Sequence, residues 1–549
     1  MIRRKLTTLG TLLFSGVLLG LSYPTMLGFW SLIFVALTPL LYVVLTRNQT
    51  GRELFLSGFV YGLGYFALVV SWYFAIYPLD WLGISSKFTS LILISLTFVL
   101  ILCVCSLFFG LFALILGKTK NFLSQTKHQT INFILFISSL WVVLEYLRAW
   151  MFSIFWFGPG ALLGPHWTMG DLGYALHAVA PLRMLASLGG VYLLSFLIVS
   201  VNVGLLFLIK HKDFAFVKPK SVALTLMAVI VLWLASGTYI YMYASSGKVT
   251  NETSVKVVLV TTDFSRDYSS NIRDLLVKPS AVLTKFGQAL KLRPDVIVLP
   301  EGSELTTALA DYYGSLSKAQ SALATVPNAK PFIILDHITV TEPTDTHPHS
   351  RLLFFDTVSG TLGHYDKRLL FPNSEYIPDI MDLLMRLAGQ SRLLNTFEYL
   401  RVLDPGKFKD VVVETRYGKI GGLICGDILS PELSRGLARN GAEIIMVSTS
   451  DATYNGAQSL VRENEAMAQI RAVETGRAFI QATNRGESYA MNSRGDVLAS
   501  YVASSSLEVL NLKLENKQTI YARFGNWILI LSALILFVSF VKLKPIIER

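Results

Sequence analysis

Long apolar runs constrain the fold of this chain more than any other feature of its sequence. A helix needs about 17–25 apolar residues to cross a bilayer, and eight segments are candidates: 7–23, 28–46, 55–76, 88–117, 131–150, 184–209, 221–243 and 525–543. Only 15% of the 549 residues are charged and 52% are hydrophobic, whereas soluble proteins average about 25% charged residues. The pattern predicts a multi-pass α-helical membrane domain with about eight transmembrane helices.

Positive charges sort the connections between these runs into two sets. One set holds most of the flanking basic residues: Arg3, Arg4, Lys5, Arg47, Arg52, Lys118, Lys120, Lys210, Lys212, Lys218, Lys220, Lys542 and Lys544. The other set, which includes LSYPTMLGFW and YPLDWLGISS, is nearly free of them. Because Lys and Arg accumulate in cytoplasmic loops, we expect both termini in the cytoplasm. The same loops account for the net charge of +11, so no nucleic-acid surface is expected. The first run lacks a small-x-small cleavage site, so we expect it to persist as a helix.

A polar segment, residues 245–523, lies between the seventh and eighth runs and should face outward. Short β-branched stretches such as DVIVLPE and KIGGLICGD alternate there with helical patterns such as SLVRENEAMAQIRAVETGRAF. Strands alternating with helices indicate a layered α/β domain. We therefore expect three parts: a seven-helix transmembrane domain over 1–244, the outer domain over 245–523, and a last helix with a cytoplasmic tail over 524–549.

A few ionisable residues fall in or beside the apolar runs. Glu145 and Arg148 stand one helical turn apart, which predicts an i,i+3 ion pair, although charges inside a membrane are also functional candidates. Four others fall in outward connections, where we expect solvent or lipid headgroups to meet them: Asp80, Asp171, His177 and Arg183.

Three predicted strands of the outer segment end on reactive side chains. Glu301 follows the strand in VIVLPEGSE, Lys367 lies in GHYDKRLLFPNSEYIP, and Cys425 ends the apolar run in GGLICGDIL. A free thiol, with a pKa of about 8.5, needs a base such as Glu301 to become a nucleophile. Lys367 could stabilise the thiolate and then an oxyanion. Each residue alone also fits a structural role, but the three together favour nucleophilic catalysis.

Two further groups complete this candidate site. The Gly426 N–H is open to approach and is a second candidate oxyanion donor, and Glu375 could orient Lys367. The segments LPEGSE, YDKRLLFPNSEYIP, ICGDI and RAVETGRAFIQATNRGESYAMNSRGDVL resemble the nitrilase (carbon–nitrogen hydrolase) superfamily. The resemblance implies an α-β-β-α sandwich with Glu301, Lys367 and Cys425 as its catalytic triad and Glu375 as its second glutamate.

The apolar half resembles one branch of that superfamily, the apolipoprotein N-acyltransferases. The likeness rests on LLGLSYPTMLGFWSLIFVALTPLL, LWVVLEYLRAWMFSIFWFGPGALLG, SLGGVYLLSFLIVSVN and TIYARFGNW. It implies a monomeric enzyme of the bacterial inner membrane whose catalytic domain faces the periplasm. Cys425 would take an acyl chain from a phospholipid as a thioester and pass it to the N-terminal amine of a diacylglyceryl apolipoprotein. This chemistry requires no metal or soluble cofactor.

The sequence departs from the superfamily pattern beside the nucleophile and one strand later. An aromatic residue and a glutamate usually follow the cysteine, whereas here Gly426 and Asp427 do, so Asp427 keeps a shortened carboxylate and the aromatic ring is lost. Ser450-Asp451-Ala452-Thr453-Tyr454 stands where Asn-Asp-x-Trp-Phe is usual. We therefore expect the triad without its usual aromatic lining. Two alternatives stay open: a membrane acyltransferase or amidase with another acceptor, or a non-catalytic lipoprotein-binding relative.

The stretch 379–402 lies between Lys367 and Cys425 and has an amphipathic pattern. Its apolar stripe comprises Ile380, Leu383, Leu384, Leu387 and Leu394, flanked by Arg386 and Arg392. Such a helix can lie on a lipid surface as a lid, and ordinary core packing is the alternative.

Overall fold

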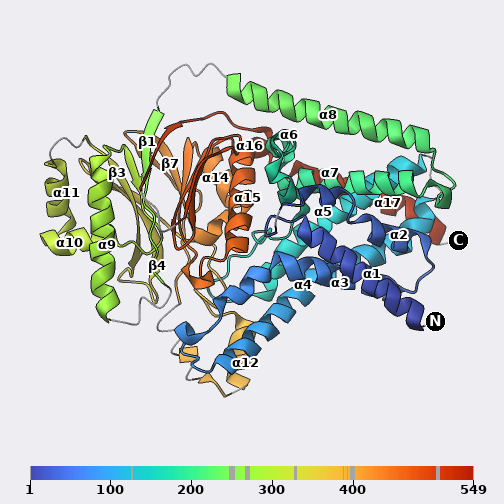
Figure 1. The fold of residues 1–549 in the computed structure, drawn as a ribbon, viewed down its shortest axis with the longest axis horizontal. Coiled ribbons are helices and arrows are strands. Elements are labelled where there is room, and N and C mark those ends of the chain that lie inside the picture. The colour runs from blue at the N-terminus through green and yellow to red at the C-terminus, as the bar shows by residue number, and fades with distance from the viewer. Residues whose placement is uncertain are drawn as a thin grey trace.

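The computed structural model describes residues 2–26, 28–124, 128–246, 254–265, 272–326, 330–387, 389–391, 394–395, 402–502 and 507–547. Figure 1 shows two parts, a helical part and a part built around two β-sheets. Both chain ends lie at the end of the helical part that is remote from the sheets (Figure 1).

The helical part contains the predicted apolar runs. Its principal helices are α1 (Ile2–Leu21), α2 (Thr38–Thr46), α3 (Gly51–Val69), α4 (Lys87–Leu123), α5 (Gln129–Phe155), α7 (Ala186–Ile209), α8 (Pro219–Ser246) and α17 (Trp527–Ile547). Within the described residues, α4, α5, α7 and α8 are long and apolar enough to cross a membrane. A helical membrane region is therefore confirmed, while the number of eight spans stays a prediction.

The run 28–46 is not the single helix that its composition predicts. It forms a short 3-10 turn, η1 (Trp30–Phe34), followed by the separate nine-residue α2. Pro39 lies in the first turn of α2, where its missing N–H costs no hydrogen bond. The break comes from this local chemistry, which an average of hydrophobicity does not register.

The charged residues of the helical part differ from the sequence-based prediction. Arg148 Nη2 lies 2.5 Å from Asp171 Oδ1 rather than pairing with Glu145. Glu145 instead accepts hydrogen bonds from Trp141 Nε1 at 2.8 Å and from Leu172 N at 3.0 Å. The predicted i,i+3 pair is wrong because the connection after α5 folds back against the helices and brings in Asp171.

The same folding back removes two expected surface charges. Asp171 is fully buried, and Arg183 is only 4% exposed, with Nη2 2.8 Å from Asp496 Oδ1. Asp171 and Arg183 therefore do not meet solvent or headgroups as predicted.

Two six-stranded sheets form the other part, in the orders β12-β1-β2-β3-β4-β5 and β11-β10-β9-β8-β7-β6. The strands are β1 (Ser254–Leu259), β2 (Val296–Val298), β3 (Ile333–Val340), β4 (His349–Asp356), β5 (Gly360–Asp366), β6 (Val412–Thr415), β7 (Gly418–Ile424), β8 (Ile444–Ser450), β9 (Ala478–Asn484), β10 (Glu487–Met491), β11 (Val497–Val502) and β12 (Glu508–Lys513). Figure 1 shows them between α9 (Ile272–Lys291), α10 (Leu305–Tyr313) and α11 (Leu316–Ala324) on one face and α14 (Pro431–Arg439) and α15 (Gln458–Thr475) on the other. The predicted α-β-β-α layering is confirmed.

Alternation along each strand explains the layers. In β2, Val296 and Val298 join the core between the sheets, whereas Ile297 faces the core under α9 and α10. Successive strand residues point to opposite faces, so a strand covered on both sides is apolar throughout, and all three residues are fully buried.

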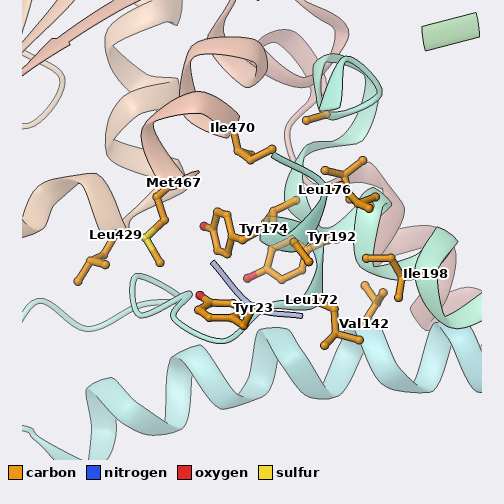
Figure 2. Packing of buried hydrophobic residues seen from close by; sticks show 14 of the residues in the cluster. Tyr23, Val142, Leu172, Tyr174, Leu176, Tyr192, Ile198, Leu429, Met467 and Ile470 are labelled. Atoms are coloured by element: carbon orange, nitrogen blue, oxygen red, sulfur yellow. The ribbon is translucent and has the colours of Figure 1, made fainter. Parts of the chain in front are cut away.

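The two parts share one continuous core. Figure 2 shows Met467 and Ile470 of α15 packed with Tyr23, Tyr174 and Tyr192, which come from the helical part. A break in α7 at Gly190 (φ +69°) frees the N–H of the next residue, Val191, which donates to Glu474 Oε1 at 2.8 Å. The sheet part is thus joined to the membrane helices by both apolar packing and buried hydrogen bonds.

The predicted amphipathic stretch is partly described. Its first part forms α12 (Asp379–Leu387), in which Leu383, Leu384 and Leu387 are 56%, 50% and 76% exposed. Leu394 is buried, and Arg392 lies outside the described residues. Core packing therefore does not account for the leucines of α12.

Candidate active site

Cys425 occupies a sharp turn at the end of β7. The chain passes there directly into the 3-10 turn η7 (Cys425–Leu429), and Cys425 has φ of +46°. A non-glycine residue in this region carries strain of order 1–3 kcal/mol. The surrounding fold holds the thiol in this conformation, at the wall of the pocket described below.

Lys367 follows β5 and is held by two carboxylates. Its Nζ lies 2.6 Å from Glu375 Oε1 and 3.5 Å from Glu301 Oε1, and its side chain is 1% exposed. Glu375 Oε2 accepts the Phe371 N–H at 2.8 Å, so the second glutamate is itself fixed. The structure therefore brings Lys367, Glu375 and Glu301 together as the sequence predicts.

Glu301 lies just beyond β2, and hydrogen bonds fix the backbone around it. Its N–H donates to Thr449 O at 3.2 Å, and the N–H of Gly302 donates to His337 Nδ1 at 2.9 Å. Burial and the charge of Lys367 lower the pKa of His337 to about 3. A neutral imidazole can accept the Gly302 N–H, so His337 positions the loop without adding charge.

Burial and charge set the resting protonation states of the triad. Burial and the negative charge of Glu301 raise the pKa of Cys425 well above its ordinary value, and Lys367 opposes them. Burial disfavours the charged form of Lys367, but Glu301 and Glu375 outweigh it and raise the lysine pKa. At neutral pH the site therefore holds a thiol, an ammonium and a carboxylate able to accept the thiol proton.

One pocket of about 700 Å³ contains the three triad side chains. Trp72, Trp81 and Met169, from connections between helices of the membrane part, also line it. The pocket therefore opens at the junction of the two parts. Within the described ranges, no cluster of three His, Cys, Asp or Glu side chains is arranged to hold a metal ion.

The pocket keeps an aromatic wall despite the departures in sequence. Trp72 and Tyr454 meet edge to face with ring centroids 5.1 Å apart, and Phe371 lies 6.5 Å from Tyr454 and 5.4 Å from Trp167. A Cβ atom on Gly426 would lie 2.2 Å from Phe371 Cε2. The Phe371 ring thus fills the space beside the nucleophile, and the expected loss of aromatic lining is wrong.

Asp427 ties the lysine loop to the cysteine turn. Its Oδ1 accepts the Leu369 N–H at 2.9 Å, and its Oδ2 accepts the Ile424 N–H at 3.0 Å and the Tyr365 hydroxyl at 2.9 Å. Burial raises the pKa of Asp427 to about 6. This carboxylate is fully engaged with the protein, so its place is beneath the reacting groups rather than among them.

Two buried carboxylates of the pocket are not assigned a role by sequence reasoning. Glu463 accepts hydrogen bonds from Tyr23 Oη at 2.9 Å and from Trp72 Nε1 at 2.8 Å, both in the membrane part. Asp451 lies at the end of β8 and lines the pocket. The available signal was an acidic residue on an otherwise apolar helix face for Glu463, and a strand end for Asp451.

Comparison with known proteins agrees with this architecture. Residues 15–204 match the apolipoprotein N-acyltransferase N-terminal domain, and residues 280–523 match the carbon–nitrogen hydrolase domain. The chain is 26% identical to the apolipoprotein N-acyltransferase of Geobacter metallireducens over 93% of its length and 90% of that protein. It is 25% identical to the Thermotoga maritima protein of that name, over 98% of this chain and 94% of the relative. The yeast nitrilase-superfamily protein Nit3 covers 49% of this chain and 92% of its own, with 19% identity and a TM-score of 0.34.

These matches and the layered fold define a membrane-bound protein of the carbon–nitrogen hydrolase superfamily. Within it, the chain belongs to the apolipoprotein N-acyltransferase family, as similarity to its curated members extends over nearly the whole sequence. The sequence-based assignment to this family, and to the N-acyltransferase class of enzyme, is confirmed.

Proposed function

We propose that this enzyme transfers an acyl chain from a membrane phospholipid, through a thioester on Cys425, to the N-terminal amine of S-diacylglyceryl-cysteine apolipoproteins. The observation that carries the proposal is the position of Lys367, fixed between Glu301 and Glu375 in the pocket that contains Cys425. A cation held there can stabilise an oxyanion next to the thiol without reorganisation.

The first half-reaction forms the acyl-enzyme. Glu301 takes the thiol proton as the Cys425 sulfur attacks the ester carbonyl, and Lys367 with the Gly426 N–H stabilises the oxyanion. Glu301 then returns the proton to the leaving glyceryl oxygen as the C–O bond breaks, which releases a lysophospholipid. The raised thiol pKa keeps the nucleophile protonated until substrate arrives.

The second half-reaction passes the acyl group to the amine. The nitrogen attacks the thioester carbon, an amide C–N bond forms and the C–S bond breaks. Glu301 takes a proton from the nitrogen and delivers it to the departing sulfur. The enzyme returns to its starting protonation state.

The same proposal includes the topology. The protein is a monomer with eight spans in the bacterial inner membrane, and the catalytic domain of residues 245–523 faces the periplasm. The transmembrane parts are 1–244 and 524–549. Both chain ends lie far from the sheets (Figure 1), which supports this orientation. The exposed leucines of α12 would then contact the outer lipid surface.

Intact-mass analysis tests the acyl-enzyme. Purified wild-type protein incubated with phospholipid should gain the mass of a fatty-acyl group, and the Cys425→Ala variant should not. Adding a diacylglyceryl lipopeptide should discharge the adduct and acylate the peptide. If wild-type protein gains no adduct, the thioester route is wrong, and a lipoprotein-binding role becomes the better description.

A further inference from the structure

Asp451 is a buried carboxylate that the two half-reactions above do not use. It is 3% exposed and lies on the wall of the active-site pocket. Its backbone N–H donates to Asn484 O at 2.9 Å. Among the described residues, none donates a hydrogen bond to its carboxylate or forms an ion pair with it. Such a group normally finds a partner within the protein, so its open side points to a ligand.

The fold provides specific room for this carboxylate next to the reacting groups. A Cβ atom on Gly486 would lie 2.1 Å from Asp451 Oδ2, so a larger residue at position 486 would displace the side chain. Asp451 follows Thr449 by two residues, and the carbonyl of Thr449 accepts the Glu301 N–H. The charge of Asp451 also contributes to the raised pKa of the Cys425 thiol. Asp451 therefore belongs to the immediate surroundings of the triad.

The pocket has an excess of acidic groups. Its ionisable residues are Lys278, Glu301, Glu304, His337, Lys367, Glu375, Cys425, Asp451, Tyr454 and Glu463. Lys367 is engaged by two glutamates, and Lys278 stands over the Phe264 ring, 5.8 Å from its centroid. Glu463 is occupied by Tyr23 and Trp72. A cationic ligand would fit this balance, and Asp451 is the carboxylate without a partner to receive it.

The proposed reaction contains such a cation. An N-terminal amine has a pKa of about 8, so it arrives mostly as an ammonium ion, which has no lone pair for attack. Glu301 handles one proton during aminolysis and returns it to sulfur, which leaves the extra ammonium proton without an acceptor. Deprotonation before attack therefore requires a second base.

We propose that Asp451 binds the ammonium group of the acyl acceptor and removes its first proton, an inference that rests on the proposed function. The ammonium N–H bond breaks, its electron pair stays on nitrogen, and the proton passes to an Asp451 oxygen. The neutral amine then attacks the thioester as described, and Asp451 releases its proton to water after the product leaves. Asp451 is in this account a catalytic residue of the second half-reaction alone.

The acidity of Asp451 suits this task. Burial, and next the charge of Glu301, raise its pKa to about 7. A base whose pKa lies near that of the amine can accept the proton and lose it again at neutral pH.

The test separates the two half-reactions in the full-length enzyme. Acyl-enzyme is formed first from phospholipid, and its discharge by a diacylglyceryl lipopeptide is then followed by intact mass. The Asp451→Asn variant should form acyl-enzyme at least as fast as wild type. Its discharge at about pH 7 should be about 100-fold slower, and the deficit should shrink as the pH rises past the amine pKa of about 8. The exposed Asp311→Asn change on α10 is the matched control and should behave as wild type.

A neutral nucleophile provides the decisive comparison. Hydroxylamine is uncharged at neutral pH, so it should discharge wild-type and Asp451→Asn acyl-enzymes at equal rates. The inference is wrong if the variant discharges with lipopeptide as fast as wild type, or if lipopeptide and hydroxylamine are slowed equally. Failure of the wild type to form any acyl-enzyme would instead reject the proposed function.

Discussion

Buried charges occur in two regions of this protein, and the fold treats them differently. In the membrane part, Arg148 is paired with Asp171, and Glu145 accepts two hydrogen bonds from its surroundings. In the pocket, Cys425 sits on a strained backbone, and Asp451 has no partner among the described residues. Ionic groups that the protein itself neutralises hold a structure together, whereas groups left open mark where a substrate supplies the missing partner.

The sharpest way to break this contrast is to remove the cation of the pocket. Lys367→Met should slow acyl-enzyme formation by about 1,000-fold, because the oxyanion loses its positive partner and Glu301 faces Glu375 without it. Mass spectrometry of the acyl-enzyme against time measures the rate. Lys419→Met, an exposed lysine at the start of β7, is the control, and equal loss in both variants would contradict the assignment.

The corresponding change in the membrane part should affect stability. Arg148→Met leaves Asp171 buried without its cation and should cost about 3–5 kcal/mol of unfolding free energy. Thermal unfolding in detergent measures this cost. The double variant Arg148→Met/Asp171→Leu should recover most of it, since both charges are gone. If the double variant is no better than the single one, the pair is not the source of the loss.

Asp451 should show the opposite sign in stability. Its pKa is raised to about 7, whereas an unfolded aspartate titrates near 3.9, at about that reference value. The folded state therefore binds the proton more tightly, and its stability falls by about 1 kcal/mol per pH unit between those values. Asp451→Asn should be more stable than wild type above pH 7, at about the folded pKa, with the gain vanishing in acid. A melting temperature that is lower than wild type at every pH would contradict this reading.

The smallest expected effect concerns the contact between Phe371 and Gly426. Gly426→Ala should slow acylation by about tenfold, because the new methyl group meets the Phe371 ring and must displace it. The double variant Gly426→Ala/Phe371→Val should recover most of the rate, since valine vacates that space and keeps its backbone N–H for Glu375. Acyl-chain preference should shift in the double variant, and an unchanged preference would show that this wall does not contact the acyl chain.

The sequence was most informative where function depends on local order along the chain. Glu301, Lys367 and Cys425 each end an apolar strand, and strands of opposing sheets bring their ends together, so the cluster was predictable. The Arg148–Asp171 pair was not, because it depends on how a loop folds back over more than twenty residues. The role of Phe371 was equally hidden. An aromatic ring can fill the same space from a different loop, and only packing shows which loop provides it.

The pocket walls come from both parts of the chain, with Trp72, Trp81 and Met169 on the membrane side. The finished catalytic chamber is therefore a product of assembly, complete only after the membrane helices have inserted and packed. A chain still in synthesis, or one cut after its last helix-to-sheet connection, presents the thiol in an open cleft without its acyl-facing wall. Reactivity towards lipid is in this way coupled to correct insertion, which protects the cell from a free thiol acting on the wrong substrates.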